Sequence, residues 1–299
     1  MGMNDTPSHE ERAHPRPLPQ AGGEKIRACL SAAALRLAPV SDTARLDAEL
    51  LMAHALGVPR DTMLLSHLDD PAPQAFDALV ERRLTHEPVA YITGVREFWT
   101  ISLAVGPGVL IPRPDSETLI EAAVAHFGRR GHKTVLDLGT GSGALLLASL
   151  AEWPDATGTG IDASPDALAI ADENARRLGL SDRVTLRRRD WAEGIQGRFD
   201  LVLCNPPYVE SEAELSAGVK DFEPEAALFA GVDGLDAYRR LVPQLPALLA
   251  PGGLIAVEIG SRQAGAVSRL FEAAGLVPEI RRDLGARDRA ILHFALGMG

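Results

Sequence analysis

The chain has 299 residues, of which 46% are apolar and 24% charged, a composition typical of a soluble globular protein. Its net charge of −11 argues against a general nucleic-acid binder, because such binding depends largely on neutralising phosphates. Two cysteines make no disulfide framework, and no run of about 18 or more apolar residues predicts a membrane span, so we expect a cytoplasmic protein of about two domains.

The amino-terminal part begins with residues 1–23, which are rich in Pro, His, Glu and Arg and lack the apolar core of a signal peptide. We expect this segment to be disordered. In residues 24–90, apolar side chains recur at helical spacing in four stretches; Ser41 or Asp42 is expected to cap the second, and Gly57 to end it. This pattern predicts a small helical bundle. Its functional interpretation is a substrate-recognition domain for a macromolecular partner, and the alternative, which this segment alone favours, is a structural cap.

The strand-like run from Glu97 to Val105 lies between Gly94 and the turn residues Gly106-Pro-Gly108. We interpret residues 91–112 as a β-hairpin linker. Directly after it, Asp115 or Ser116 is expected to cap a helix.

From Thr134 onward, strand patterns alternate with helical ones, and Ser164 with Pro165 is expected to begin one of these helices. Alternation of this kind indicates a mostly parallel sheet with helices on both faces. The last two strands have no helix between them, so one strand must run antiparallel. Residues 113–299 are therefore predicted to form an α/β domain with seven strands, at residues 134–138, 157–161, 184–186, 199–204, 253–259, 277–281 and 290–296.

A glycine-rich loop, Asp137-Leu-Gly-Thr-Gly-Ser-Gly143, joins the first strand of this domain to its first helix. Such a loop lets the backbone approach a ligand beyond the carboxyl ends of the strands. Asp162 ends the second strand, where a carboxylate can accept both ribose hydroxyls. The loop lacks dinucleotide-binding spacing and a following basic side chain, which favours S-adenosylmethionine over NAD. The predicted cofactor-binding residues are Gly139, Thr140, Gly141, Ser142, Gly143, Asp162, Trp191 and Asn205.

Two further positions complete this prediction. Asp137 is expected near the positive methionine part of the cofactor. Asp190 and Trp191 follow the third strand and are expected at the adenine, with Trp191 as a stacking surface. The alternative for Trp191 is a core residue at a strand end.

A second motif, Asn205-Pro-Pro-Tyr208, directly follows the buried strand that ends at Cys204. The two prolines fix two φ angles and hold the preceding residues extended. The Asn205 amide oxygen and the Pro206 carbonyl can accept the two N–H bonds of a planar NH₂ group, while Tyr208 packs on its face. A bare Asn-Pro pair is more simply a rigid turn, but the longer motif in this place is much more specific. We therefore predict Asn205, Pro206 and Tyr208 as catalytic residues, Pro207 as a further substrate contact, and no metal.

The cofactor loop, Asp162, Asp190-Trp191 and this motif together resemble a class I S-adenosylmethionine-dependent methyltransferase acting on a planar nitrogen. From about Gly23 to the carboxyl end, further segments resemble the PrmC/HemK family: Glu87-Pro-Val-Ala-Tyr-Ile-Thr-Gly94, Glu97-Phe-Trp99, Pro107-Gly-Val-Leu-Ile-Pro-Arg-Pro114, Glu223-Pro-Glu-Ala-Ala-Leu228, Gly231-Val-Asp-Gly-Leu235 and Arg282-Asp-Leu-Gly-Ala-Arg-Asp-Arg289. The sequence departs from the family at Asp115-Ser116-Glu117, where Glu-Thr-Glu is common, and at Ser142, where Thr is also frequent.

The resemblance implies methylation of the glutamine in the Gly-Gly-Gln loop of class I peptide chain release factors, with S-adenosylhomocysteine as product, by an enzyme expected to be a monomer without direct nucleic-acid or membrane contact. The entrance of the pocket is expected to be lined by Glu223, Glu225 and Arg113. The alternative for Arg113 is an ion pair with a carboxylate that fixes the linker. One rival is an amino-directed DNA methyltransferase, which shares the Asn-Pro-Pro-Tyr motif but usually carries a basic recognition domain. The other is a non-catalytic cofactor-binding subunit.

Overall fold

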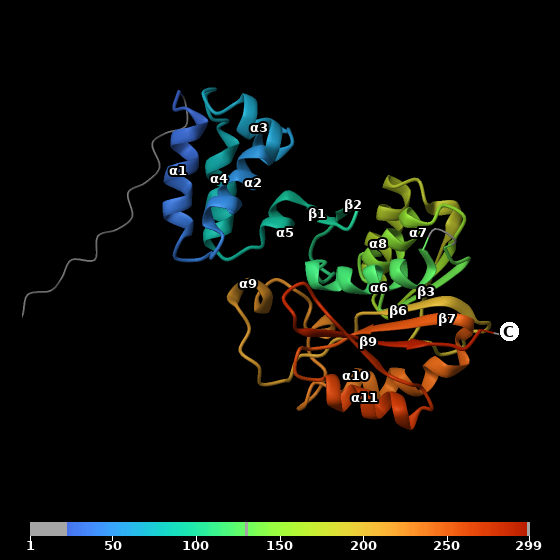
Figure 1. Cartoon of the computed structure of the whole chain (residues 1–299). Helices are drawn as coiled ribbons and strands as arrows, with labels where there is room; N and C mark the ends of the chain where they lie inside the picture. Colours follow the sequence, from blue (N-terminus) through green and yellow to red (C-terminus); the bar gives the residue numbers. More distant parts are fainter. Residues whose placement is uncertain (1–22, 129–130, 298–299) are drawn as a thin grey trace, which may run out of the picture. The chain divides into compact units, whose positions relative to one another are not determined.

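A computed structural model of the chain describes residues 23–128 and 131–297 (Figure 1). The chain divides into two compact units, Met1–Thr93 and Gly94–Gly299. All of the segment expected to be disordered, apart from Gly23, lies outside the described residues. The division at Thr93 falls inside the stretch interpreted as a linker, so the predicted hairpin lies within the second unit.

The first unit is a helical bundle whose core includes Leu30, Leu51 and Phe76, all fully buried. Gly57 ends the second helix in the left-handed conformation, with φ +69°, as its place in the sequence predicts. The predicted cap of this helix was wrong, because its N-cap residue is Thr43 and the Ser41 hydroxyl accepts from the Thr43 amide outside the helix. The helices are α1 (Ile26–Leu37), α2 (Ala44–Leu56), α3 (Arg60–Ser66), α4 (Ala75–Leu84) and a short fifth helix that was not predicted, α5 (Val89–Thr93).

The second unit is built on a seven-stranded sheet of order β5-β4-β3-β6-β7-β9-β8. Only β9 runs antiparallel to its neighbours, which confirms the predicted exception at the carboxyl end. The strands are β3 (Thr134–Leu138), β4 (Thr157–Asp162), β5 (Val184–Arg188), β6 (Phe199–Cys204), β7 (Leu249–Glu258), β8 (Glu279–Arg282) and β9 (Asp288–Phe294).

Helices cover both faces of this sheet (Figure 1). Alternate residues along a strand point to opposite faces, and in β6 Leu201 and Leu203 pack into one core while Val202 and Cys204 pack into the other. The first core holds α6 (Glu117–Phe127), α7 (Ala144–Glu152) and α8 (Pro165–Arg177), and the second holds α10 (Asp236–Leu241), the 3-10 segment η5 (Val242–Ala247) and α11 (Ala264–Ala273). Because both faces of the sheet are buried, β6 is continuously apolar from Leu201 to Cys204 and β7 from Leu254 to Val257.

The predicted hairpin forms from β1 (Val95–Phe98) and β2 (Ile101–Ala104). It is bound to the α/β core, because the Trp99 amide donates to Glu117 at 2.8 Å and the Trp99 indole donates to Glu152 at 3.2 Å. Asn174 of α8 accepts from the Ala104 amide at 2.6 Å and donates to its carbonyl at 3.0 Å. The hairpin is therefore a fixed part of the second unit.

Three local features differ from expectation. Ser116 is the N-cap residue of α6, but its hydroxyl makes no capping hydrogen bond and donates to Glu258. The strand expected from Gly253 begins earlier, at Leu249. A short helix that was not predicted, α9 (Ala217–Lys220), lies between β6 and α10.

Candidate active site

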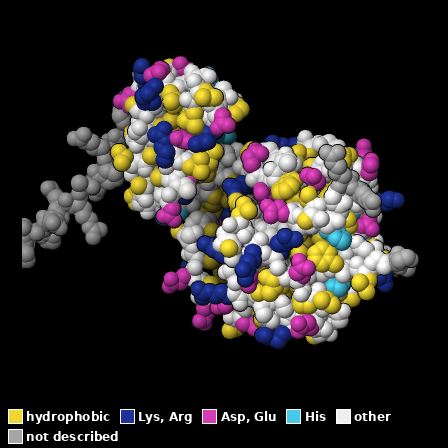
Figure 2. Space-filling view, in the orientation of Figure 1, with side chains coloured by type: hydrophobic (Ala, Val, Ile, Leu, Met, Phe, Trp, Pro, Cys, Tyr) yellow, Lys and Arg dark blue, Asp and Glu magenta, His cyan; other side chains and the backbone are white. Residues whose placement is uncertain are grey.

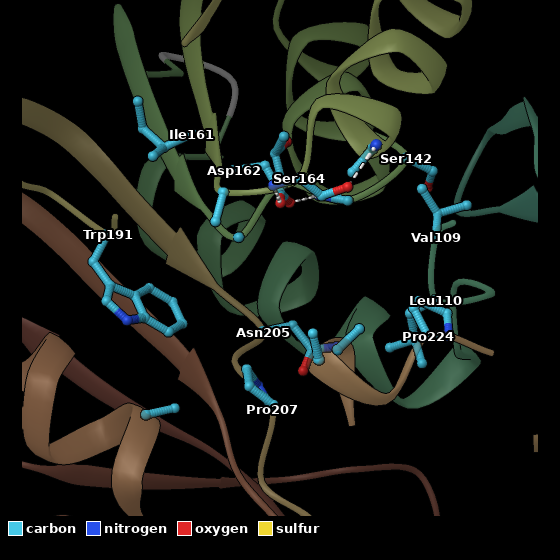
Figure 3. A pocket seen from close by; sticks show the side chains of 18 of the residues that line it. Val109, Leu110, Ser142, Ile161, Asp162, Ser164, Trp191, Asn205, Pro207 and Pro224 are labelled. Carbon is cyan, nitrogen blue, oxygen red and sulfur yellow. Dashed lines mark hydrogen bonds between the residues drawn. The ribbon is translucent and has the colours of Figure 1, made fainter. Parts of the chain in front are cut away.

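A cavity of about 650 Å³ opens at the carboxyl ends of β3, β4, β5 and β6, where each strand contributes its following loop (Figure 3). This is where the strand order reverses, since β3 has β4 on one side and β6 on the other. Ligands of open α/β sheets bind at such points. A cavity of this size is in the range that holds a small-molecule cofactor.

The glycine-rich loop forms one wall of the cavity. Its turn is held by the amides of Gly139 and Thr140, which both donate to the Ile161 carbonyl, at 2.9 and 2.8 Å. Gly141 has φ +56°, and a Cβ there would meet nothing within 4 Å, so its backbone faces open space. A Cβ at Gly139 would lie 3.7 Å from the Trp191 ring and 3.9 Å from the Asn205 carbonyl oxygen, filling the gap between them. The loop thus keeps its backbone accessible to a ligand.

Asp162 lies at the end of β4 and points its carboxylate toward this loop (Figure 3). One oxygen accepts from the Gly141 amide and the other from the Ser164 amide, both at 2.9 Å. Ser164 in turn caps α8 by accepting from the Ala167 amide at 3.2 Å, with Pro165 at the first helical position as predicted. Each oxygen of Asp162 retains a lone pair for hydroxyl donors of a ligand.

Trp191 lines the cavity on the side opposite Val109 and Leu110 (Figure 3). Its backbone has φ +49°, a left-handed conformation that is unusual for a bulky residue and turns the chain after β5 toward the cavity. The ring also packs against the core shared by α10 and α11, so Trp191 is in part a core residue, and its stacking on adenine stays a prediction. The neighbouring Asp190 also lines the cavity and forms an ion pair with Arg240.

Asn205 and Pro207 line the cavity below the cofactor loop (Figure 3). The Asn205 Nδ2 donates to the Ser116 hydroxyl at 3.0 Å, and within the described chain no donor lies within hydrogen-bond distance of its Oδ1. Pro206 is buried and Tyr208 half-buried, and neither is among the residues that line the cavity. The Tyr208 hydroxyl donates to Glu258 at 3.3 Å.

The structure therefore brings most of the predicted cofactor and substrate residues to one cavity. Its lining includes Gly139, Thr140, Gly141, Ser142, Asp162, Trp191, Asn205 and Pro207, and does not include Gly143. Asp137 lies buried beneath the loop, where its Oδ2 accepts from the Thr140 hydroxyl at 2.7 Å and its Oδ1 has no partner among the described residues. Burial raises the pKa of Asp137 to about 7.

Glu223 connects two loops that line the cavity, its own and the one that contains Ile111 and Arg113. Glu223 itself is not part of the lining, but the next residue, Pro224, is. Its buried carboxylate accepts from the Ile111 amide at 3.0 Å and from Arg113 at 2.5 Å. Of the two interpretations offered for Arg113, the structure shows the ion pair.

Sequence reasoning missed polar groups that lie behind the cavity or, in the case of Ser116, in its wall. Glu258 is a charged residue at the end of the apolar run in β7, and this interruption was a signal that could have been used. Ser116 was considered only as a helix cap, and Asn174 not at all, although Asn174 is completely buried and donates to the Ser142 carbonyl at 2.9 Å. These side chains lie far apart in the sequence, so no local motif joins them.

The described residues include neither a group of side chains suited to a metal ion nor a helix suited to a membrane. In the ranges 23–128 and 131–297, no three or more His, Cys, Asp and Glu side chains are grouped so that they could hold a metal ion. Among the helices of the same ranges, none has the length and apolar character needed to cross a membrane. On the face shown in Figure 2, Lys and Arg side chains lie among Asp and Glu side chains.

Two family models match the chain: the PrmC N-terminal domain over residues 28–94 and the methyltransferase small domain over residues 115–229. Among solved structures, the hMettl16 catalytic domain has a TM-score of 0.54 at 15% identity, with 69% of this chain and 79% of that chain covered. A T. thermophilus 16S rRNA methyltransferase in complex with AdoMet and guanosine has a TM-score of 0.50 at 19% identity, with 67% and 49% covered. At these identities the two structures establish the fold alone.

Curated relatives are much closer in sequence. A release factor glutamine methyltransferase of Rhodospirillum rubrum is 48% identical over 254 residues, which cover 83% of this chain and 78% of the relative. One of Caulobacter vibrioides is 44% identical over 259 residues, with 84% and 89% covered. The chain belongs to the release factor glutamine methyltransferase family.

Proposed function

We propose that this protein transfers a methyl group from S-adenosyl-L-methionine to the side-chain amide nitrogen (N5) of a glutamine in peptide chain release factors. The observation that carries the proposal is the placement of Asn205, whose amide lies at the cavity below the cofactor loop with its nitrogen bonded to Ser116. Its oxygen is thus left to accept from an incoming NH₂ group. Membership of the family supports the same substrate.

The residues present fit the cofactor. Gly139 and Gly141 leave the space that a Cβ would fill, Asp162 offers acceptors suited to ribose hydroxyls, and Trp191 offers an aromatic face for adenine. Thr140, Ser142 and Gly143 complete the loop. When bound, S-adenosyl-L-methionine supplies a methyl group that its positively charged sulfur has already activated, and S-adenosyl-L-homocysteine is the product.

The chemical task left to the protein is to orient a poor nucleophile, because an amide nitrogen shares its lone pair with its own carbonyl. The Asn205 oxygen and the Pro206 carbonyl accept the two N–H bonds and turn the lone pair toward the methyl donor. They also stabilise the positive charge that develops on the nitrogen. Pro207 and Tyr208 hold the side chain flat, and fixing this geometry supplies much of the rate gain. The proton can leave after transfer, so no general base is required.

The finer assignments rest on the family resemblance. We place the target glutamine in the Gly-Gly-Gln loop of class I release factors, assign the helical unit to substrate recognition, and expect a monomeric cytoplasmic enzyme without direct nucleic-acid contact. A glutamine presented on a protruding loop suits a cavity whose acceptors lie beyond the strand ends.

The test is mass spectrometry of a release factor after incubation with the purified chain and S-adenosyl-L-methionine. We expect one added methyl group on the Gly-Gly-Gln glutamine, and none with the Asn205→Ala variant. The Ser149→Ala variant is a matched control, since Ser149 is fully buried but its hydroxyl bonds to His132 away from the cavity. Methylation of plasmid DNA without modification of the release factor would reverse the proposal in favour of the DNA rival.

A further inference from the structure

A chain of hydrogen bonds runs from the cavity into the interior beneath Asn205. The Asn205 Nδ2 donates to the Ser116 hydroxyl at 3.0 Å, and that hydroxyl donates to Glu258 Oε2 at 2.5 Å. The other carboxylate oxygen, Oε1, accepts from the Tyr208 hydroxyl at 3.3 Å. Glu258 is only 1% exposed and Ser116 only 3%, so neither can exchange its partner for water.

The direction of these bonds follows from the chemistry of the groups. An ionised carboxylate can only accept, so the single Ser116 proton must point at Glu258. The Ser116 oxygen is then available only as an acceptor, and the Asn205 group that faces it must be the NH₂. The amide oxygen of Asn205 is thereby directed toward the cavity.

We propose that Ser116 and Glu258 are positioning residues that, when Glu258 is ionised, hold the Asn205 amide with its oxygen toward the substrate. This inference rests on the proposed function, because it explains how Asn205 becomes an acceptor for the glutamine NH₂. Ser116 lines the cavity and Glu258 does not, and we assign neither of them a contact with the reacting atoms. Both act through the orientation of Asn205.

Protonation of Glu258 removes the constraint. A protonated carboxyl can donate to the Ser116 oxygen, which frees the Ser116 proton to point at Asn205. The Asn205 amide can then rotate by half a turn and accept that proton through its oxygen. Its NH₂ would face the NH₂ of the substrate, and two donors cannot bond to each other.

The surroundings of Glu258 place this change near neutral pH. Burial raises the pKa of Glu258 from 4.5 to about 7, against the opposing effects of the Ser116 hydrogen bond, the Arg289 charge and the Tyr208 hydrogen bond. The titratable and charged groups that face it from the packed elements are Tyr208, Arg289, Asp115, Cys204 and Tyr238. Arg289 pairs directly with Asp115 at 2.8 Å and with Asp283 at 3.2 Å, so its charge is shared with other carboxylates.

The experiment compares the wild-type chain with Ser116→Ala, Ser116→Thr, Glu258→Gln and the control Ser149→Ala, each assayed on a release factor. Turnover should fall about tenfold in Ser116→Ala, which loses the middle of the chain of bonds, and recover in Ser116→Thr, which keeps the hydroxyl. Affinity for S-adenosyl-L-methionine, measured by calorimetry, should stay within about twofold in all variants, because these groups lie outside the cofactor loop.

The pH profile separates positioning from general support of the fold. Wild-type turnover should fall as pH drops below about 7, where Glu258 becomes protonated. Glu258→Gln cannot titrate and should show a smaller inflection, limited to any part due to Asp137, whose pKa is also raised to about 7. As a readout independent of activity, ¹³C NMR should show a glutamate carboxyl signal that titrates near pH 7 in the wild type and is missing in Glu258→Gln.

The outcomes distinguish a failure of the proposed function from a failure of the positioning role alone. If the wild-type chain methylates no glutamine, the proposed function fails. If it does so but Ser116→Ala turns over at the wild-type rate, or Glu258→Gln keeps the inflection at its full wild-type amplitude, the positioning role is wrong. The positioning role would also be wrong if Ser116→Ala lowered thermal stability and cofactor affinity together with turnover, and Ser116→Thr restored none of them.

Discussion

Two buried carboxylates of the helical unit and two of the α/β unit are held in opposite ways, although a third in the α/β unit, Glu223, pairs with Arg113. In the helical unit, Asp47 and Glu49 are each 6% exposed and each meets arginine directly. Arg83 lies 2.8 Å from Asp47, while Arg45 and Arg60 each lie 2.6 Å from Glu49. In the helical unit, the negative charge of each of these carboxylates is therefore balanced by an arginine, which stays positively charged.

In the α/β unit, Asp137 and Glu258 are each 1% exposed, and their side-chain partners in the described structure are hydroxyl groups. No Lys or Arg nitrogen of the described residues lies within ion-pair distance of either. Burial therefore dominates and raises both pKa values to about 7.

The pKa of Glu49 moves the other way. Burial would raise it, but hydrogen bonds from Arg45 and Arg60 outweigh burial and lower it. A carboxylate with an arginine partner keeps its charge and serves the fold. A buried carboxyl held by hydroxyl groups can gain or lose a proton near neutrality, and both such groups here lie behind the cavity, a location that favours a functional role.

The largest effect on stability should come from breaking a pair in the helical unit. Arg83→Met leaves Asp47 buried without its counter-charge and should lower the free energy of unfolding of this unit by about 3 kcal/mol. The measurement is urea unfolding followed by circular dichroism. The adjacent Arg82→Met is the control, since its pair with Glu87 is more exposed and should contribute at most about 1 kcal/mol. Equal losses in both variants would remove the contrast between the units.

At the site, Asn205→Ala should lower turnover by about 10²–10³-fold, because it removes an acceptor that is strengthened as charge develops on the nitrogen. Cofactor affinity should change little, since Asp162 and the glycine loop remain. Single-turnover kinetics and calorimetry on the same preparation test this split. A near-normal rate would exclude Asn205 from the chemistry.

Glu258 should also make stability depend on pH near neutrality, whereas the lowered pKa of Glu49 in the helical unit makes stability depend on pH only under acid conditions. Its folded pKa of about 7 exceeds its ordinary 4.5, so its contribution is complete below pH 4.5 and is lost as pH rises through about 7. The loss should amount to about 3 kcal/mol. Unfolding of Glu258→Gln at several pH values should show a smaller slope, with the remainder due to Asp137. An unchanged slope would show that Glu258 is ionised throughout.

The smallest effect should follow from Tyr208→Phe, which keeps the ring but removes the 3.3 Å hydrogen bond to Glu258. Turnover should fall about two- to threefold. Because that bond lowers the pKa of Glu258, its loss should move the acid limb of the rate profile to higher pH. A shift to lower pH would contradict the arrangement described here.

Features specified by neighbouring residues were predictable from the sequence. Gly57 ends α2 and Ser164 with Pro165 begins α8, because caps depend on a few adjacent positions. The glycine loop and the Asn205 motif each follow a strand, so the common end of parallel strands was enough to predict that they meet.

Features that join distant parts of the chain were not predictable. Ser116 is 142 residues from Glu258, and its hydroxyl had a local alternative as a helix cap that the structure does not use. The failed cap at Ser41 has a similar origin, since several short polar side chains compete for one helix end. Local propensity does not predict which hydrogen bond a polar side chain makes when a partner from a distant part of the chain binds it more strongly than a local one.

The side-chain carboxamide of Asn174 connects its own helix, α8, with two other segments. It forms hydrogen bonds with the backbone of Ala104 in β2 and donates to the carbonyl of Ser142 in the glycine-rich loop. With both amide ends engaged, the side chain has no freedom to follow one segment and release the other. Any displacement of the hairpin along α8 must either carry the glycine loop with it or sever these bonds. By thermodynamic linkage, a ligand that binds the loop more tightly while these bonds are formed would stabilise the bonds and, through them, the position of the hairpin.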